Sequence, residues 1–266
     1  MPYLCPAVRR FALAATLLAL PAAAQPANPR DAAPACTAPA GLVRFDRPLA
    51  HLAARIAQRR SVTVVAVGSS STAGLGAGSP AASYPARLEG LLKARFRDVP
   101  ITVLNRGVGG EEIREMLARF DRDVIAPKPD LVLWQIGTNS VLHDHEVTGN
   151  APVLAAGLNR LKGTSADVVL VNPQYAPKVL AHPAVETMLR LIASTAKQSN
   201  VDLFDRFAVM KYWRNGAKLP FEAFLSPDQL HMNDWAYNCL AELLSVAIVE
   251  AASRAQVSAG APVARN

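Results

Sequence analysis

The sequence is poor in cysteine, and its histidines do not form a recognisable metal site. The three cysteines, Cys5, Cys36 and Cys239, lie far apart, which excludes the paired-cysteine motifs of structural zinc sites. The nearest approach to a ligand cluster is His143-Asp144-His145-Glu146, in which four potential ligands are consecutive and no second cluster completes a site. We therefore expect no metal, and we interpret residues 143–146 as a polar loop.

The sequence also lacks the motifs and charge patterns of nucleotide and nucleic-acid binding. Its glycines do not form G-x-G-x-x-G, and the phosphate-binding motif G-x-x-x-x-G-K-[ST] is absent. The formal net charge is +7, but the basic residues are scattered and do not form a stripe interleaved with aromatic residues. We therefore expect no cofactor and no nucleic-acid partner.

The N-terminal apolar run, Phe11–Leu20, is shorter than the ~20 residues that a membrane-spanning helix needs. It follows two arginines and precedes the small residues Pro21–Ala24, an order typical of a cleaved secretory signal peptide. We predict a signal peptide over residues 1–24, with cleavage after Ala24. The protein is then exported, periplasmic or secreted, and has no stable membrane anchor.

Cleavage would leave 242 residues, 266 minus 24, which fits one α/β domain better than two. It would also leave two cysteines, Cys36 and Cys239. In an oxidising compartment these two residues can pair. The alternative is two unpaired thiols, and the sequence favours neither state. It does not indicate the oligomeric state either.

Short apolar runs alternate with helical patterns along the chain. Apolar runs without alternation suit strands buried on both faces, and we predict such strands at Val62–Val67, Ile101–Leu104, Leu131–Ile136, Val168–Val171 and Val201–Phe204. Helical spacing predicts a first helix around Leu49–Ile56 and others at about 84–96, 111–126, 152–162, 184–198 and 233–253. This order predicts an α/β fold, a three-layer α/β/α sandwich with a five-stranded parallel sheet and flavodoxin-like topology. The domain spans residues 44–253, between a flexible lead-in at 25–43 and a disordered tail at 254–266.

The residues that follow the strands carry the candidate chemistry, since ligands of open α/β sheets bind beyond the carboxyl ends of the strands. Gly68–Gly74, which contains three consecutive serines, follows the first strand, and Asn105–Gly110 follows the second. Gly137–Ser140 follows the third strand, and Asp228–His231 stands directly before the last helix. Each fragment alone suits an ordinary turn or helix cap, but their joint order is much more specific.

In this order the four fragments resemble the blocks of the SGNH hydrolases, also called GDSL hydrolases, over about residues 61–250. Aligning the first block on its two glycines implies that Ser70 is the nucleophile and that Ser69 stands where the family usually has Asp. The resemblance implies the same fold and a serine esterase without metal or cofactor. The matching residues of the later blocks are Gly110, Asn139, Asp228 and His231.

The chemistry of ester hydrolysis needs these residue types. A serine hydroxyl is a weak nucleophile until a base takes its proton, and His231 is suited to this near neutral pH. A carboxylate three residues earlier, Asp228, can orient the imidazole through Nδ1. The oxyanion of the tetrahedral intermediate needs donors, for which we expect the backbone N–H groups of Ser70 and Gly110 and the amide of Asn139.

Two features argue against an α/β-hydrolase. Thr72 stands where the G-x-S-x-G elbow has its second glycine, and the acid and the histidine are only three residues apart.

Two further groups of residues have open interpretations. Asn172–Tyr175 either lines the site or forms a proline-led turn, and four aromatic residues either wall an acyl or sugar pocket or belong to the core: Tyr212, Trp213, Phe221 and Phe224.

We therefore expect an exported serine esterase that hydrolyses small acyl esters, with acetyl esters of saccharides as the first choice, through an acyl-Ser70 intermediate. Lysophospholipase, thioesterase or arylesterase activity, or acyl transfer to a sugar hydroxyl, are alternatives because the SGNH family spans them. A different class is a catalytically silent saccharide-binding domain. The intact Ser70, Asp228 and His231 count against that class.

Overall fold

The computed structural model describes residues 1, 3, 33–143 and 147–260. The chain divides into two units, Met1–Ala33 and Pro34–Asn266, and the second contains the folded domain. Almost all of the predicted signal peptide lies outside the described residues, so it stays a prediction.

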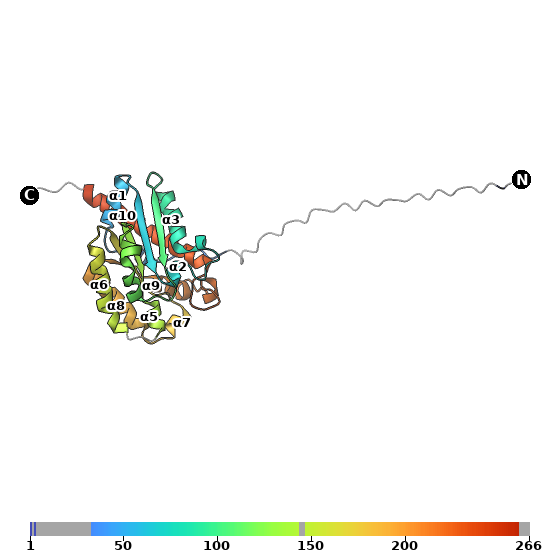
Figure 1. Cartoon of the computed structure of the whole chain (residues 1–266). Coiled ribbons are helices and arrows are strands. Elements are labelled where there is room, and N and C mark those ends of the chain that lie inside the picture. Colours follow the sequence, from blue (N-terminus) through green and yellow to red (C-terminus); the bar gives the residue numbers. More distant parts are fainter. Residues whose placement is uncertain (2, 4–32, 144–146, 261–266) are drawn as a thin grey trace, which may run out of the picture. The chain divides into compact units, whose positions relative to one another are not determined.

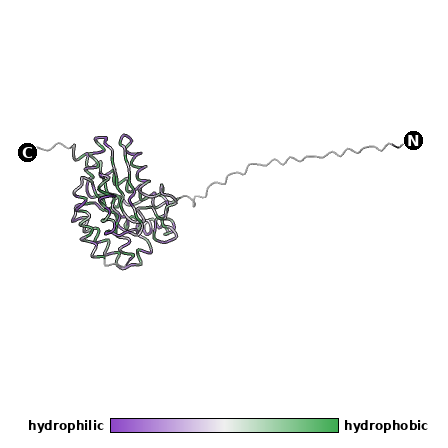
Figure 2. The backbone as a smooth tube through the Cα atoms, in the orientation of Figure 1, coloured by the Kyte–Doolittle hydropathy of each residue, from purple (hydrophilic) through white to green (hydrophobic). Residues whose placement is uncertain are grey.

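Five parallel strands form the centre of the domain (Figure 1). They are β1 (Val62–Gly68), β2 (Ile101–Gly107), β3 (Leu131–Gln135), β4 (Asp167–Val171) and β5 (Asp202–Phe204), in the spatial order β2-β1-β3-β4-β5. Every residue of β3 is buried, as expected for a strand covered on both faces. In Figure 2 the hydrophobic stretches of the chain lie in the middle of the domain. The predicted fold class and flavodoxin-like strand order are confirmed.

Helices cover both faces of the sheet. The α-helices are α1 (Ala50–Ala57), α2 (Ser70–Ala73), α3 (Tyr84–Arg95), α4 (Ile113–Ala118), α5 (Thr138–Leu142), α6 (Asn150–Lys162), α7 (Pro177–Leu180), α8 (Val185–Ser199), α9 (Arg206–Asn215) and α10 (Asp234–Gly260). Helices α1, α3 and α10 pack together, and α4, α6 and α8 form the other group. This division follows from right-handed crossovers, because β1 to β2 runs one way along the sheet and the later connections run the other way.

Two predicted helices differ from the structure. The predicted helix at 111–126 is two elements, because α4 ends at Ala118 and a π-helical turn, η4, follows at Asp121–Ile125. Between them Arg119 turns inward and bonds to strand ends. The last helix, α10, continues to Gly260, so the prediction of a disordered tail is wrong for residues 254–260. Residues 261–266 lie outside the described residues.

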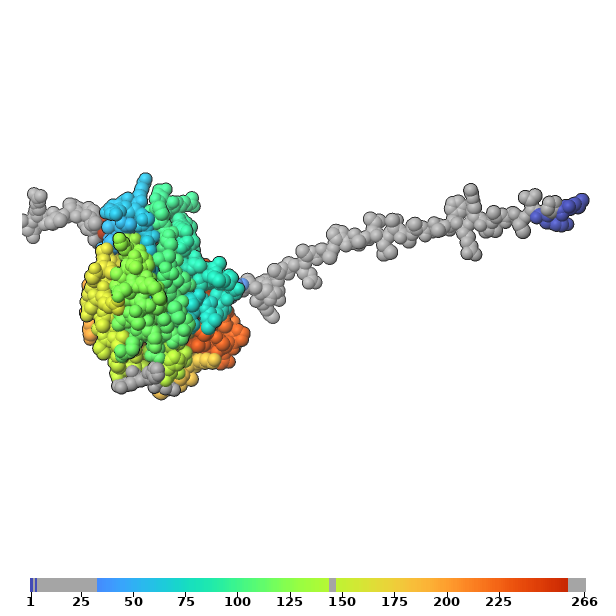
Figure 3. Space-filling view, viewed as in Figure 1, coloured from blue at the N-terminus to red at the C-terminus, as the bar shows by residue number. Residues whose placement is uncertain are grey.

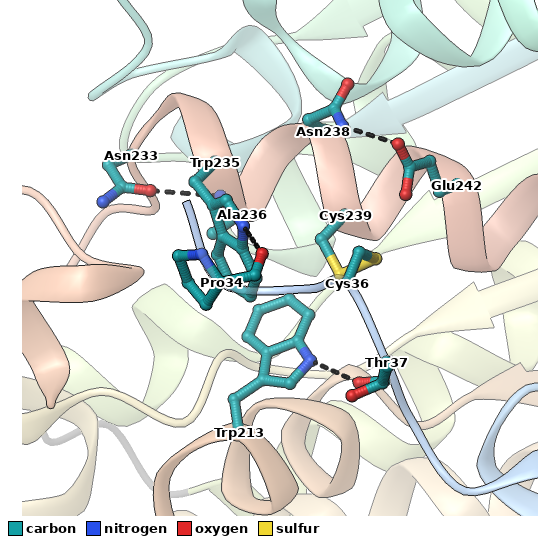
Figure 4. Close-up of a disulfide and its surroundings, with 10 residues drawn as sticks. All are labelled: Pro34, Cys36, Thr37, Trp213, Asn233, Trp235, Ala236, Asn238, Cys239 and Glu242. Carbon is teal, nitrogen blue, oxygen red and sulfur yellow. Dashed lines mark hydrogen bonds between the residues drawn. A yellow bond between two sulfur atoms is a disulfide. The ribbon is translucent and has the colours of Figure 1, made fainter. Parts of the chain in front are cut away.

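The prediction of a flexible lead-in is wrong for Pro34–Val43. Cys36 forms a disulfide with Cys239 of α10, which settles the pairing that the sequence left open (Figure 4). The indole N–H of Trp235 donates to the Pro34 carbonyl at 2.8 Å, and that of Trp213 donates to the Thr37 carbonyl at 3.1 Å. Composition alone does not reveal these contacts, because they come from distant parts of the chain.

Helix α10 is the one helix in the described part of the chain that is long and apolar enough to cross a membrane. Within the tested span, Asp234–Val257, 67% of the most apolar window is buried in the domain. Its neighbours are α1 and α3. Burial inside the domain accounts for its composition, as for other core helices.

We expect loss of the disulfide to destabilise the domain. The bond closes a loop with a sequence separation of 203 residues, and the chain-entropy model gives about 5 kcal/mol for such a loop, with measured values usually nearer 2–4 kcal/mol. The Cys36→Ala/Cys239→Ala variant should therefore have a lower denaturation midpoint than the oxidised protein. Reductant should lower the midpoint of the wild type and leave that of the double variant unchanged. Peptide mapping that finds both thiols free in oxidised protein would contradict this assignment.

Candidate active site

The nucleophile turn lies at the carboxyl end of β1, where Ser70 is the first residue of α2. Ser70 Oγ is 2.8 Å from His231 Nε2. The neighbouring serines bond elsewhere: Ser69 Oγ donates to Gln135 at 3.0 Å, and Ser71 Oγ accepts from Arg206 at 2.9 Å. Of the three consecutive hydroxyls, the one expected from the block alignment is therefore the one brought to the imidazole.

The segment before α10 folds into a tight loop that presents both Asp228 and His231. Asp228 Oδ1 accepts the backbone N–H groups of Leu230 and His231, at 3.0 and 2.9 Å. Its other oxygen, Oδ2, is 2.5 Å from His231 Nδ1. Gln229 takes a left-handed conformation, with φ of 58°, which turns the chain between the acid and the base. One carboxylate therefore both builds the loop and orients the imidazole.

The electrostatic surroundings keep Asp228 ionised. Burial alone would raise its pKa, but hydrogen bonds from the His231 side chain and from the backbone N–H groups of His231 and Leu230 outweigh burial and lower the pKa. The carboxylate is thus negatively charged at neutral pH. It can stabilise the imidazolium that forms when His231 takes a proton.

The loop after α2 packs against the loop that carries His231. The Ser226 hydroxyl donates to the Gly76 carbonyl at 3.2 Å. A Cβ at Gly76 would lie 2.5 Å from the Met232 carbonyl oxygen, so this approach requires glycine. Figure 3 shows the two segments side by side, the first in cyan and the second in orange-red. The nucleophile and the base therefore come from segments that pack directly on each other.

The second and third blocks meet through a hydrogen bond beyond the carboxyl ends of β2 and β3. Gly110 has a φ of 82°, and within the described part of the chain no atom beyond its two neighbours in sequence lies within 4 Å of the position that a Cβ would occupy, so the space on that side of its backbone is open. Asn139 is in α5 and is 7% exposed. Its Nδ2 donates to the Glu111 carbonyl at 2.8 Å. A primary amide carries two N–H groups, and this bond engages one of them.

Arg119 holds the second block in place. Its guanidinium pairs with the Glu111 carboxylate at 2.6 Å and donates to the carbonyls of Gly68 and Arg106, at 3.3 and 2.9 Å. These carbonyls lie at the ends of β1 and β2. The arginine therefore ties the residue that binds Asn139 to the strand ends next to the nucleophile turn.

The four aromatic candidates and the segment after β4 are buried or partly buried. Trp213 and Phe224 are buried in the core, and Phe221 is partly buried and stacks on Tyr175. Tyr212 is also partly buried and packs against the core. Gln174 is buried and bonds to residues of the third and last blocks, so the Asn172–Tyr175 segment connects these two blocks inside the domain.

The predicted polar loop at 143–146 is described only at His143, whose Nδ1 is 2.8 Å from Glu112 Oε1. Within the described residues, no three side chains of His, Cys, Asp or Glu are grouped to hold a metal ion. The absence of a metal and of a cofactor stays a prediction.

Sequence reasoning missed three polar residues that organise the site: the buried Gln135 and Arg206, and the partly buried Arg119. Gln135 stands inside an apolar run, and Arg206 opens a helix that the sequence analysis did not predict. Gln135 could have been found from one sequence signal: it is a polar residue within a buried strand, and such residues need hydrogen-bond partners.

The comparison with protein families covers most of the domain. Residues 35–254 match the model of the non-GDSL lipase-like family. The chain belongs to this family.

Relatives of known activity agree with this assignment. An acetylxylan esterase from Geobacillus stearothermophilus is 29% identical over 172 residues, which is 58% of this chain and 75% of that protein. The crystal structure of Axe2, an acetylxylan esterase from the same organism, matches with a TM-score of 0.57 and 22% identity, over 70% of this chain and 94% of that one. The predictions of an SGNH-like family and of the esterase class are confirmed.

A two-domain esterase active on acetylated mannans has a similar fold. It matches with a TM-score of 0.64 and 18% identity over 79% of this chain. The match spans 56% of that longer protein. At this identity the likeness shows the shared α/β fold.

The family description fits the first block, which reads Gly-Ser-Ser-Ser in place of Gly-Asp-Ser-Leu. Gln135 Oε1 accepts three hydrogen bonds here, from the backbone N–H and hydroxyl of Ser69 and from the Thr72 hydroxyl. A carboxylate at position 69 would face this amide oxygen, acceptor against acceptor. The serine is therefore matched to the glutamine of β3.

We expect Ser69→Asp to destabilise the protein by about 2 kcal/mol, because it buries a carboxylate against an acceptor and removes a donor. Ser69→Ala, the matched control, loses only the hydroxyl and should cost about 1 kcal/mol. Urea denaturation of the three proteins measures the difference. An aspartate variant as stable as the wild type would show that Gln135 does not restrict position 69.

Proposed function

We propose that the protein is an exported acetyl esterase acting on acetylated saccharides, with Ser70 as its nucleophile. The observation that carries this proposal is the Ser70–His231–Asp228 array, with distances of 2.8 and 2.5 Å, at the end of the strand that lies between those leading to Gly110 and Asn139. In the first half-reaction, Ser70 Oγ attacks the ester carbonyl and His231 Nε2 takes the hydroxyl proton. Asp228 stabilises the resulting imidazolium.

The tetrahedral intermediate places a negative charge on the former carbonyl oxygen. The Ser70 N–H at the start of α2, the Gly110 N–H and the second amide N–H of Asn139 donate to it. The intermediate collapses when His231 returns the proton to the alcohol oxygen, which leaves as the free hydroxyl of the saccharide. Water then attacks the acyl-Ser70 carbonyl with His231 as base, and the release of acetate restores the Ser70 hydroxyl.

The substrate class rests on the relatives, which act on acetylated xylan and acetylated mannans. Export rests on the signal-peptide pattern at residues 1–24, and the Cys36–Cys239 bond supports it because disulfides persist in oxidising compartments. An exported enzyme meets extracellular polysaccharides directly.

Acetate release from acetylated xylan and acetylated mannan tests the substrate class. Turnover of p-nitrophenyl esters of increasing chain length, measured in parallel, tests the preference for a short acyl group. We expect the acetate ester to be the best of the series and acetate to be released from at least one polysaccharide. Faster turnover of long-chain esters or lysophospholipid, with no acetate release, would contradict the proposal.

We predict that a fluorophosphonate probe labels Ser70. Ser70 is the serine that bonds to the base, whereas the hydroxyls of Ser69 and Ser71 bond to Gln135 and Arg206. Mass spectrometry of the labelled peptide locates the adduct, and Ser70→Ala should abolish both labelling and ester hydrolysis. An adduct on Ser69 or Ser71 in wild-type protein would overturn the assignment.

We predict that Asn139→Ala lowers kcat about 100- to 1000-fold with little change in KM, because an oxyanion donor acts mainly in the transition state. The lost bond to Glu111 should also lower stability by about 1 kcal/mol. Asn238→Ala is the control, because Asn238 bonds to Arg87 and Glu242, which belong to helices and not to the catalytic blocks. Near-wild-type kcat in folded Asn139→Ala protein would remove this residue from the mechanism.

A further inference from the structure

Arg206 is a buried cation whose hydrogen-bond acceptors are neutral. It is the first residue of α9 and has 0% exposure. Its Nε donates to the Asn172 carbonyl, its Nη1 to the Ser71 hydroxyl and its Nη2 to the Gln174 amide oxygen, each at 2.9 Å. The three bonds use the planar fork of the guanidinium in a way that a lysine ammonium cannot reproduce.

Burying the charged guanidinium without a carboxylate among its hydrogen-bond partners lowers the stability of the folded state. Burial lowers the pKa of Arg206 to about 10, so the side chain remains charged at neutral pH. Burial also raises the pKa of the nearby Tyr84 to about 12, which keeps that residue neutral. Apolar residues often replace buried charges without loss of stability. A buried cation with neutral acceptors therefore indicates a role other than stability.

Gln174 extends the contacts of Arg206 to the other blocks. It is 1% exposed and follows β4. Its Oε1 accepts from Arg206 and from the Thr138 hydroxyl, both at 2.9 Å, and its Nε2 donates to the Leu230 carbonyl at 3.3 Å. The orientation of the amide is determined, because a guanidinium can only donate.

The pair has four outer contacts, and three of them share one property: each lies one position from a residue of the proposed mechanism. Ser71 follows Ser70, Thr138 precedes Asn139, and Leu230 precedes His231. The fourth contact, the Asn172 carbonyl, directly follows β4. We propose that Arg206 and Gln174 are positioning residues that hold the nucleophile, the oxyanion donor and the base in register. They form one buried link between segments that lie far apart in the sequence.

The inference rests on the proposed function, because it assigns these residues to the same reaction. Displacing a catalytic group by about 1 Å costs on the order of 100-fold in rate, even when the mutation lies away from the reacting atoms. Weakening the hydrogen bonds of this pair should therefore lower kcat and leave KM nearly unchanged, since both side chains are buried, with 0% and 1% exposure.

Two conservative variants separate positioning from stability. Gln174→Glu keeps the acceptor for Arg206 and Thr138 and adds an ion pair, but it loses the donor to Leu230 and places a carboxylate against that carbonyl. Arg206→Lys keeps the charge and loses the fork. Arg87→Lys is the matched control, because Arg87 also bonds to a carbonyl and a side-chain amide, those of Ala82 and Asn238, away from the catalytic residues.

The readouts are kcat and KM on p-nitrophenyl acetate, the denaturation midpoint, and the rate at which a fluorophosphonate labels Ser70. We expect kcat and the labelling rate to fall about 10- to 100-fold in both variants, with KM within about twofold. The Glu variant should keep a midpoint close to that of the wild type, because the new ion pair with Arg206 offsets the repulsion from the Leu230 carbonyl. The Arg87 variant should keep kcat.

Wild-type kcat and labelling in either the Glu or the Lys variant would overturn the positioning role, as would a loss of kcat in proportion to a loss of stability. The labelling rate reports Ser70 reactivity whatever the natural substrate is. Failure of the wild type to release acetate from polysaccharides would therefore count against the proposed function and leave the test of the Arg206–Gln174 pair intact.

Discussion

The hydrogen bond between Ser70 and His231 joins two residues 161 positions apart, and the geometry of the candidate active site depends on it. Ser70 lies at the end of β1, between β2 and β3, so strand order brings the segments that carry Gly110 and Asn139 to the same edge of the sheet. His231 follows none of the strands directly. It reaches the site because the loop closed by Asp228 packs on the glycine-containing loop after α2. The sheet therefore supplies the nucleophile and the oxyanion donors, and loop packing supplies the base.

The sequence predicted the features that depend on local pattern. Apolar runs marked all five strands, the blocks at strand ends marked Ser70 and Asn139, and the block before the last helix marked His231. What it could not predict depends on contacts between distant residues. The lead-in looked flexible because proline and alanine give no periodicity, yet Cys36 anchors it. The helix break at Arg119 arises because this side chain bonds to strand ends.

The first block illustrates how a family pattern can change without loss of the catalytic geometry. Ser69 occupies the position where the SGNH family usually has aspartate. Its hydroxyl donates to Gln135, 66 residues later in β3, and this acceptor favours serine over aspartate at position 69. The backbone N–H and the hydroxyl of Ser69 share one amide oxygen, which orients the turn that carries Ser70. The residue type at position 69 therefore depends on the residue at position 135, and a motif confined to the segment around Ser70 contains only the first of the two.

The disulfide connects the stability of the domain to the position of the base. Cys239 lies in the second turn of α10, and this helix begins three residues after His231. The lead-in that carries Cys36 also accepts hydrogen bonds from Trp213 and Trp235, whose ring centroids are 5.1 Å apart. The start of α10 is therefore held on one side by the lead-in and on the other by the loop after α2, where Gly78 donates to Asp234 at 2.7 Å. Because the Asp228–His231 loop enters α10 at this point, restraining the helix start also restrains the imidazole relative to Ser70.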